Sequence, residues 1–386
     1  MSNVELSARG GRGYYRAIGM TLVVVAALAV VLGAQARPGS ARRLGKCPVI
    51  DIFAGQGGSS VGARATPYDQ YAAVIQRNIK RRYPGSAVYV VATPGSAFNV
   101  SALADSTAST CWLAFGGMGT SVDAAMAVYQ FEGQRVTTVR TVGPLWLDFI
   151  QVVVRAPDGA YPNDRPMTEL ADLCQPNRVL ETGPTSSGTE RIGEILLHQL
   201  RSRSPTCNPQ IRNSSLTDAV DAVRRGRADA LLWSGGAPTT TIAAALRDPA
   251  GRTLTLLPLD EGYLKGMQIE WNNKYPALHG GDYRQWTLQR NDYAGLNPTY
   301  TIASSNVVLV NKAADANLVK FVADLLVTDR QEFEAALWGS DQKGRHFLDP
   351  KTEIEENQLY CTVTLHKAAA DYYLSHLGFN RSCLGP

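Results

Sequence analysis

The chain has 386 residues, of which 45% are hydrophobic and 19% charged, and its formal net charge is +4. This is the composition of an ordinary globular protein with an ample core, and the length predicts two domains on a prior of roughly 100–200 residues each. Because no basic stripe interleaves with aromatic residues, the sequence argues against a nucleic-acid partner.

The N-terminus has the pattern of a targeting segment. Three arginines precede an apolar run from Ala17 to Ala34, and Ala34-Gln35-Ala36 fits the small-x-small cleavage pattern. The run is also about as long as the ~18 residues of a membrane span. We therefore interpret residues 1–36 as a signal peptide or a retained membrane anchor and residues 37–46 as a tether. Either form predicts an exported body, in the periplasm or on the outer face of the cytoplasmic membrane.

The six cysteines favour disulfides, because their number is even, the body is expected to be exported, and none are spaced as Cys-x-x-Cys. We predict the pairs Cys174–Cys207 and Cys361–Cys383, since each pair brackets one local unit of the chain. Buried free thiols are the alternative interpretation.

Strand-like and helix-like segments alternate from residue 47 onward. The expected strands of the first part are 47–54, 87–92 and 110–115, and the expected helices are 67–83, 99–106 and 122–129. This alternation is typical of βαβ units around a mainly parallel sheet. Residues 136–155 then form one long strand-rich stretch, which we interpret as the first crossing between two domains.

A second α/β block follows the crossing. It comprises strand 178–180, a helix opening at the loop Gly183–Glu190, segment 210–213, helix 217–225 with Thr217 as its N-cap, strand 228–233, strand 254–257 and helix 260–267. Residues 270–298 are rich in Gly, Asn and Tyr and are expected to form a loop. The chain is expected to end with strand 300–310, one long helix over 313–337, and a strand and a helix within 359–377.

Four loops of small residues follow predicted strands, at 55–62, 93–97, 116–121 and 183–189. In open α/β sheets, ligands lie outside the carboxyl ends of the strands, where such loops gather. The most informative loop is Gly183–Glu190, because it leads into a helix with apolar residues at i, i+3, i+4 and i+8. Unpaired N–H groups at that helix start, with hydroxyls beside them, predict a site for a small carboxylate or phosphate.

The same loops lack the motifs of nucleotide binding and of catalysis. Residues 55–60 miss the Gly-x-Gly-x-x-Gly spacing, and the chain has no P-loop motif. Gly58–Gly62 matches Gly-x-Ser-x-Gly, but no helix follows directly, which argues against Ser60 as a nucleophile. Glu190 is interpreted as a first-turn charge that favours the helix N-terminus. We therefore expect no enzymatic activity, no cofactor and no metal site.

A second unusual element is Trp233–Thr239, where a Trp at a strand end precedes a Gly pair and a Pro-Thr-Thr helix start. It can wall a pocket and donate hydroxyls, although the alternative is that Trp233 belongs to the core and Thr239 merely caps a helix. Arg64 or Arg191 is a candidate cation for a bound acid, with solvated arginines as the alternative.

Several blocks together resemble the solute-binding proteins of TAXI-type TRAP transporters (TRAP-associated extracytoplasmic immunogenic proteins). The similar blocks are Gly183–Glu190, Asp229–Pro238, Leu256–Glu261, Tyr300–Val310 and Leu365–Tyr373. The resemblance runs from about residue 50 to 380. It implies an α/β, two-lobed type-II periplasmic-binding-protein fold with the ligand cleft between the lobes. Lobe I would comprise 47–145 and 285–386, and lobe II 146–284.

The resemblance further implies a monomer that captures a small organic acid, glutamate- or dicarboxylate-like, and docks on TRAP-type membrane permease subunits. The implied ligand-binding residues are Gly57, Gly58, Ser59, Ser60, Phe115, Gly116, Gly117, Thr185, Ser186, Ser187, Gly188, Thr189, Trp233, Ser234, Gly235 and Gly236. Two alternatives stay open: a ligand-sensing module tethered to the membrane by an uncleaved N-terminal segment, and an exported enzyme on the same fold.

Overall fold

The computed structural model describes residues 41–55, 66–105, 107–156, 166–247, 254–278, 281–294, 296–338 and 346–378. Residues Ala41–Pro386 group into one compact unit. The expected signal peptide or anchor, residues 1–36, lies outside the described residues. Within the described ranges, no helix combines the length and the apolar character needed to cross a membrane.

Strands and helices alternate through most of the chain. The first part comprises β1 (Val49–Gly55), α1 (Pro67–Arg82), β2 (Ala87–Thr93), α2 (Ser96–Ala104), β3 (Trp112–Gly117), α3 (Met118–Met126) and β4 (Val139–Arg155). The middle part comprises β5 (Val179–Thr182), α4 (Gly188–Arg203), β6 (Gln210–Asn213), α5 (Leu216–Arg224), β7 (Ala230–Gly235), α6 (Thr240–Leu246), β8 (Leu254–Leu257) and α7 (Glu261–Lys274). The last part comprises β9 (Arg284–Leu288), β10 (Thr299–Asn311), α8 (Ala316–Thr328), α9 (Arg330–Trp338), α10 (Pro350–Glu356) and α11 (Lys367–Leu377).

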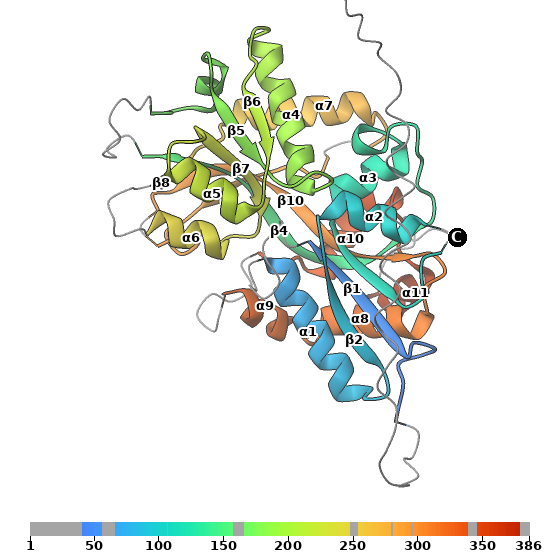
Figure 1. Ribbon diagram of the computed structural model, residues 1–386. Coiled ribbons are helices and arrows are strands. Elements are labelled where there is room, and N and C mark those ends of the chain that lie inside the picture. The colour runs from blue at the N-terminus through green and yellow to red at the C-terminus, as the bar shows by residue number, and fades with distance from the viewer. Residues whose placement is uncertain are drawn as a thin grey trace, which may run out of the picture. The chain divides into compact units, whose positions relative to one another are not determined.

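One sheet, in the order β2-β1-β3-β10-β4-β7-β5-β6, runs through the molecule, and it consists of two halves with the same plan (Figure 1). In each half, three parallel strands are followed by an antiparallel crossing strand: β2-β1-β3 by β10, and β6-β5-β7 by β4. β4 also pairs with β10 and, near its end, with β8. The expected α/β, two-lobed fold is therefore confirmed.

Local sequence explains why these elements form where they do. The first helix, α1, opens on Thr66, whose hydroxyl accepts the N–H of Asp69, and Pro67 occupies its first turn. Its last turn carries Lys80, Arg81 and Arg82, which suit the negative end of the helix dipole. The long strand β4 is buried along nearly its whole length, as expected for a strand covered on both faces.

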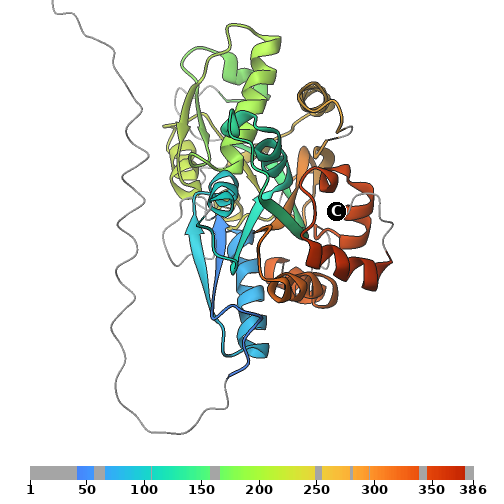
Figure 2. The ribbon, with the colours of Figure 1, turned by 90° about the vertical axis from the view of Figure 1, so that its right-hand side faces the viewer.

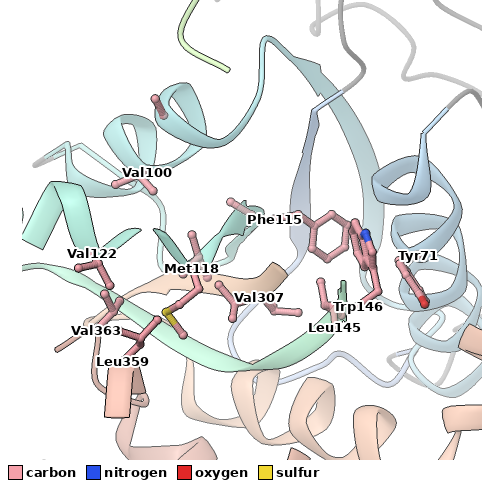
Figure 3. Close-up of a cluster of buried hydrophobic side chains, with 14 of the residues drawn as sticks. Tyr71, Val100, Phe115, Met118, Val122, Leu145, Trp146, Val307, Leu359 and Val363 are labelled. Carbon is pink, nitrogen blue, oxygen red and sulfur yellow. The ribbon is translucent and has the colours of Figure 1, made fainter. Parts of the chain in front are cut away.

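Helices cover both faces of the sheet, and the C-terminal helices, red in Figure 2, gather on one side of it. A large hydrophobic core lies around β1, β3, β4 and β10 and extends under α1 and α8. Figure 3 shows part of this core, in which the rings of Phe115, Trp146 and Tyr71 lie in a row. A second, smaller core lies under α5 and α6.

Disulfides close two loops of the described chain. Cys174–Cys207 joins the segment before β5 to the segment before β6, as the sequence predicts. Cys47–Cys111 joins the segments before β1 and β3 and is not one of the two predicted pairs. Cys361 is also disulfide-bonded, and its predicted partner, Cys383, lies outside the described residues.

Several expected boundaries are wrong, and three of the errors concern helix starts. The helices α2 and α3 begin at Ser96 and Met118, directly after Gly95 and Gly117, rather than at residues 99 and 122. The small-residue loops are thus helix tips, whose first N–H groups are not used within the helix. In α5 the N-cap is Ser215, not Thr217, because the Ser215 hydroxyl accepts the N–H of Asp218.

The C-terminal part departs further from the expectation. The helix expected over 313–337 is two helices, which break at Asp329, where the Asp329 carboxylate accepts a hydrogen bond from Arg82 at 2.7 Å. The loop expected over 270–298 contains the end of α7 and strand β9. The strand expected within 359–377 is a 3-10 turn, Gln358–Cys361, and Leu365 forms a single bridge to Thr141.

Candidate functional site

A cavity lies at the carboxyl ends of the parallel strands, where loops from both halves of the sheet meet. Its lining includes Gly55, Gly95, Ser96, Gly117, Gly119, Thr120, Ser187, Gly188, Thr189, Trp233, Ser234 and Gly235. Ligands of open α/β sheets bind at this end of the strands. The cavity has a volume of about 60 Å³, against about 150 Å³ for a cavity that holds benzene. In this arrangement of the elements it is therefore too small for the organic acid that the sequence predicts, and such an acid needs the cavity to widen.

The tip of α4 presents backbone donors to this cavity. Ser187 caps the helix, since its Oγ accepts the N–H of Glu190 at 3.0 Å. The Glu190 carboxylate accepts the N–H of Ser186 at 2.7 Å, and Ser186 lies in the left-handed region with φ of 67°. No described residue accepts a hydrogen bond from the N–H of Gly188 or Thr189. With the positive end of the helix dipole beside them, these groups have the chemistry to hydrogen-bond a small anion.

The tip of α2 lies against the tip of α4. The N–H of Phe98 donates to the carbonyl oxygen of Ser186 at 3.2 Å. Gly95, with φ of +144°, approaches so closely that a Cβ on it would lie 3.1 Å from the Cα of Ser187. The hydroxyl of Ser96 accepts the N–H of Gly117 at 3.1 Å and so ties α2 to the start of α3. Figure 1 shows α2, α3 and α4 converging in this region.

The loop after β7 closes another side of the cavity. The Thr189 hydroxyl donates to the carbonyl of Ser234 and accepts its N–H, both at 3.3 Å. A Cβ on Gly236 would lie 2.7 Å from Cγ of Pro67, so this glycine lets the loop pack on the start of α1. Trp233 is 6% exposed and belongs to the second core, and it also lines the cavity. Thr239 is the N-cap residue of α6, but its side chain makes no capping hydrogen bond.

A buried ion pair joins α4 to α3 beside the cavity. Arg191, 3% exposed, lines the cavity and pairs with Asp123, with Nη2 3.0 Å from Oδ1. It also donates to the hydroxyl of Tyr283 at 2.8 Å, and Tyr275 donates to Asp123. Burial alone would lower the pKa of Arg191, but the Asp123 carboxylate more than offsets this and raises it. The pair is neutral as a whole, and three of the five guanidinium N–H groups are engaged.

Two buried aspartates, Asp148 on β4 and Asp282 before β9, also line the cavity. Burial raises the pKa of each to about 6. Asp282 accepts the N–H of Gly119 at 3.3 Å and that of Ser305 at 3.0 Å, so the protein itself places a carboxylate at the tip of α3. Asp148 accepts a hydrogen bond from Nε1 of Trp146 at 2.7 Å.

Metal ligation has no support in the described part of the chain, where no group of three or more His, Cys, Asp or Glu side chains could hold an ion. Glu190 lies in the first turn of α4, as the sequence predicts. Its carboxylate accepts hydrogen bonds from Ser186 and Gln130, both at 2.7 Å, and so braces the loop.

The family model described as the NMT1-like family matches residues 64–374, most of the chain. The chain belongs to the NMT1-like family. The comparison with curated proteins found no match to the sequence of this NMT1-like protein.

Among solved structures, this NMT1-like chain is similar to the periplasmic binding protein BugD, with 14% identity and a TM-score of 0.48, over 88% of this chain and 99% of that one. It is similar to MatC from Rhodopseudomonas palustris with bound malate, with 14% identity and a TM-score of 0.47, over 75% and 88%. The periplasmic aliphatic sulphonate binding protein SsuA from Escherichia coli shares 16% identity, with a TM-score of 0.40, over 85% and 83%. No conclusion about the ligand follows from likenesses this distant.

The structure brings part of the predicted site of this NMT1-like protein together. The predicted residues that line the cavity are Gly117, Ser187, Gly188, Thr189, Trp233, Ser234 and Gly235. Those that do not line it are Phe115, Gly116, Thr185, Ser186 and Gly236. The ring of Phe115 is fully buried in the core beside Trp146 (Figure 3). It also stacks on Tyr68 at a centroid distance of 5.7 Å.

The first predicted loop is a separate case. Gly57, Gly58, Ser59 and Ser60 lie outside the described residues, as does Arg64. The nearest described residues on either side of this stretch, Gly55 and Thr66, both line the cavity.

Sequence reasoning missed the two acids of the cavity. Asp148 lies within the apolar stretch Leu145–Ile150, and a carboxylate in such a buried strand is a signal that could have identified it. Asp282 lies in the Gly-rich stretch that was expected to be loop, where a single carboxylate carries no signal.

Proposed function

We propose that this NMT1-like protein is an extracytoplasmic solute-binding protein that captures a small organic acid for a membrane transporter. The observation that carries the proposal is the cavity into which the tips of α2 and α4 both open, with the N–H groups of Gly188 and Thr189 unused by described residues. Each hydrogen bond to a charged group contributes roughly 1.5–3 kcal/mol. Three or four such bonds reach the roughly 8 kcal/mol of micromolar binding after ordering costs.

The two halves of the sheet act as lobes in this proposal, with 47–145 and 285–386 as lobe I and 146–284 as lobe II. Support comes from β4, whose residues Val139–Phe149 pair with β10 and whose residues Phe149–Val154 pair with β7. Capture follows if the lobes open about these strands, because the contacts on both sides of a ligand form only when the lobes are closed.

The finer assignment is a TAXI-type protein that serves a TRAP-type permease, with a glutamate- or dicarboxylate-like ligand. It rests on the sequence blocks that resemble that group. Export, with residues 1–36 as signal or anchor, is supported by the disulfides, which persist in oxidising compartments. Permease genes beside the gene for this protein are the expected finding, and their absence would favour the sensor alternative.

The binding step is tested by a thermal-shift screen over amino acids, dicarboxylates and keto acids, followed by calorimetry on the acid with the largest shift. A ligand at 100 times its dissociation constant adds roughly 2.7 kcal/mol of stability. The double variant Ser187→Ala, Thr189→Ala should lower the affinity for that acid by about tenfold or more, because each lost hydroxyl loosens the tip of α4.

The matched control is Ser215→Ala, which removes the equivalent N-cap from α5. Losing a cap costs about 1 kcal/mol of stability in either helix. The control should therefore lose stability but keep its affinity for the acid. A screen in which no acid shifts the melting temperature, or an affinity that the double variant leaves unchanged, contradicts the proposal.

A further inference from the structure

Asp148 is a buried acid in the wall of the cavity, with hydrogen-bond donors beside it but no cation among the described residues. It lies on β4, opposite Ser304 of β10, and 8% of it is exposed. One carboxylate oxygen accepts the indole N–H of Trp146 at 2.7 Å, and the side-chain amide of Asn306 also stabilises the charged form of the carboxylate. No lysine, arginine or histidine of the described ranges forms an ion pair with it. Asp148 and Ser304 both line the cavity that the tip of α4 lines.

The other acids around the cavity are neutralised or capped within the protein. Asp123 pairs with Arg191, and Asp282 accepts two backbone N–H groups, with Arg284 nearby. A buried charge is normally paired or hydrogen-bonded to several donors, because burial without them is costly. Within the described chain, Asp148 therefore lacks the cation that normally accompanies a buried carboxylate. The cavity is the side from which a cationic group of a ligand can reach it.

We propose that the cavity binds a small zwitterion of the α-amino acid class, whose ammonium group donates to Asp148 while its carboxylate lies at the tips of α4 and α2. This inference rests on the proposed function and narrows its ligand class. A ligand with carboxylates and no amino group would place negative charge against Asp148 and leave that acid without a cation. An amino acid satisfies both ends of the cavity, and its ammonium forms a charge-assisted hydrogen bond.

The inference is tested with three matched pairs of probes that differ in the amino group: L-alanine and propionate, L-aspartate and succinate, L-glutamate and glutarate. Isothermal calorimetry on the full exported chain at pH 7.5 should show, in at least one pair, the amino acid bound at least tenfold more tightly than its partner. A site with a buried group shaped for an N–H rejects the analogue that lacks it, because the group is left unpaired.

The variant Asp148→Asn keeps the size of the side chain and an acceptor for Trp146 but removes the charge. The affinity of this variant for the preferred amino acid should be at least tenfold lower than that of the wild type. Its affinity for the matching acid without an amino group should be unchanged or higher. The matched control is Asp51→Asn on β1, where Asp51 accepts the indole N–H of Trp112 at 2.9 Å but does not line the cavity. This control should bind as the wild type does. If Asp148→Asn does not fold, Asp148→Ser replaces it.

The outcomes separate the inference from the function on which it rests. Equal affinities within every pair, or an amino acid whose affinity Asp148→Asn leaves unchanged, overturn the zwitterion and leave the acid-binding function standing. The function itself is overturned if none of the six probes binds and no acid of the wider screen changes the melting temperature. A preference for the amino member that disappears in Asp148→Asn and persists in Asp51→Asn supports both.

Discussion

Asp123 on α3 and Asp148 on β4 are both buried, with 1% and 8% of their surface exposed, yet they are accommodated in different ways. Asp123 receives the guanidinium of Arg191 and the hydroxyl of Tyr275. Asp148 is stabilised by the indole N–H of Trp146 and the side-chain amide of Asn306 but by no cation of the described residues, and burial raises its pKa to about 6. The first acid is neutralised by the protein itself, in the contact between α3 and α4. The second keeps an unfavourable charge at neutral pH, and residues with such shifted pKa values cluster at functional sites.

The largest predicted effect comes from breaking the neutralised region. Arg191→Met removes the cation and leaves Asp123 buried without one, which should lower the free energy of unfolding by about 3–5 kcal/mol. Urea denaturation at pH 7 measures the loss. Arg201→Met, an exposed arginine of the same helix, is the control and should lose about 0.5 kcal/mol or less. Similar small losses in both variants would mean that the Arg191–Asp123 pair is no better satisfied than Asp148.

The opposite sign is predicted for the cavity acid. The pKa of Asp148 is about 6 in the folded protein against 3.8 for the model carboxyl, so the folded state binds more protons between these values. Its contribution to stability therefore falls as pH rises through that window, and the full penalty is present above about pH 6. Asp148→Asn should raise the free energy of unfolding at pH 7 by up to about 3 kcal/mol.

The control for this prediction is pH itself. At pH 4 Asp148 is largely protonated in the folded wild type, so the gain from Asp148→Asn should disappear there. Burial raises the pKa of the neighbouring Tyr68 well above 10, so that hydroxyl does not titrate in this range, whereas Asp282 does and is common to both proteins. A gain of equal size at pH 4 and pH 7 would mean that packing, not charge, is the cause.

The sequence predicts the fold well where signals are local. The helix predicted over 67–83 matches α1 to within one residue at each end, and Pro67 is its local start signal. No Gly or Pro marks the break between α8 and α9 in the sequence. The break coincides with the long-range contact between Arg82 and Asp329. The stretch 359–365 is another wrong prediction, a strand where a 3-10 turn is found. Its aliphatic and aromatic residues are buried, and a short apolar run does not distinguish a strand from other buried structure.

The candidate site divides in the same way. Ser187, Gly188 and Thr189 are predictable, because a small-residue loop before an amphipathic helix indicates a helix tip. Asp148 and Asp282 are brought to the cavity by strand pairing and by a loop, over sequence separations that no local pattern records. Phe115 is a residue whose position in the chain suggests the cavity, but its ring turns into the core beside Trp146.

The smallest effect is predicted for Asp282, which is intermediate between the two acids that the comparison sets apart. Burial raises its pKa to about 6, as for Asp148, but its two oxygens accept the N–H groups of Gly119 and Ser305. Asp282→Asn removes a charge penalty of up to about 3 kcal/mol. The same substitution replaces one acceptor oxygen by an amide NH2 and so leaves one buried N–H unpaired, at a cost of about 1–3 kcal/mol. The two terms nearly cancel, and urea denaturation at pH 7 should show a change within about 1 kcal/mol. A gain as large as that of Asp148→Asn would show that the backbone donors do not satisfy Asp282, and the cavity would then hold two unpaired acids instead of one.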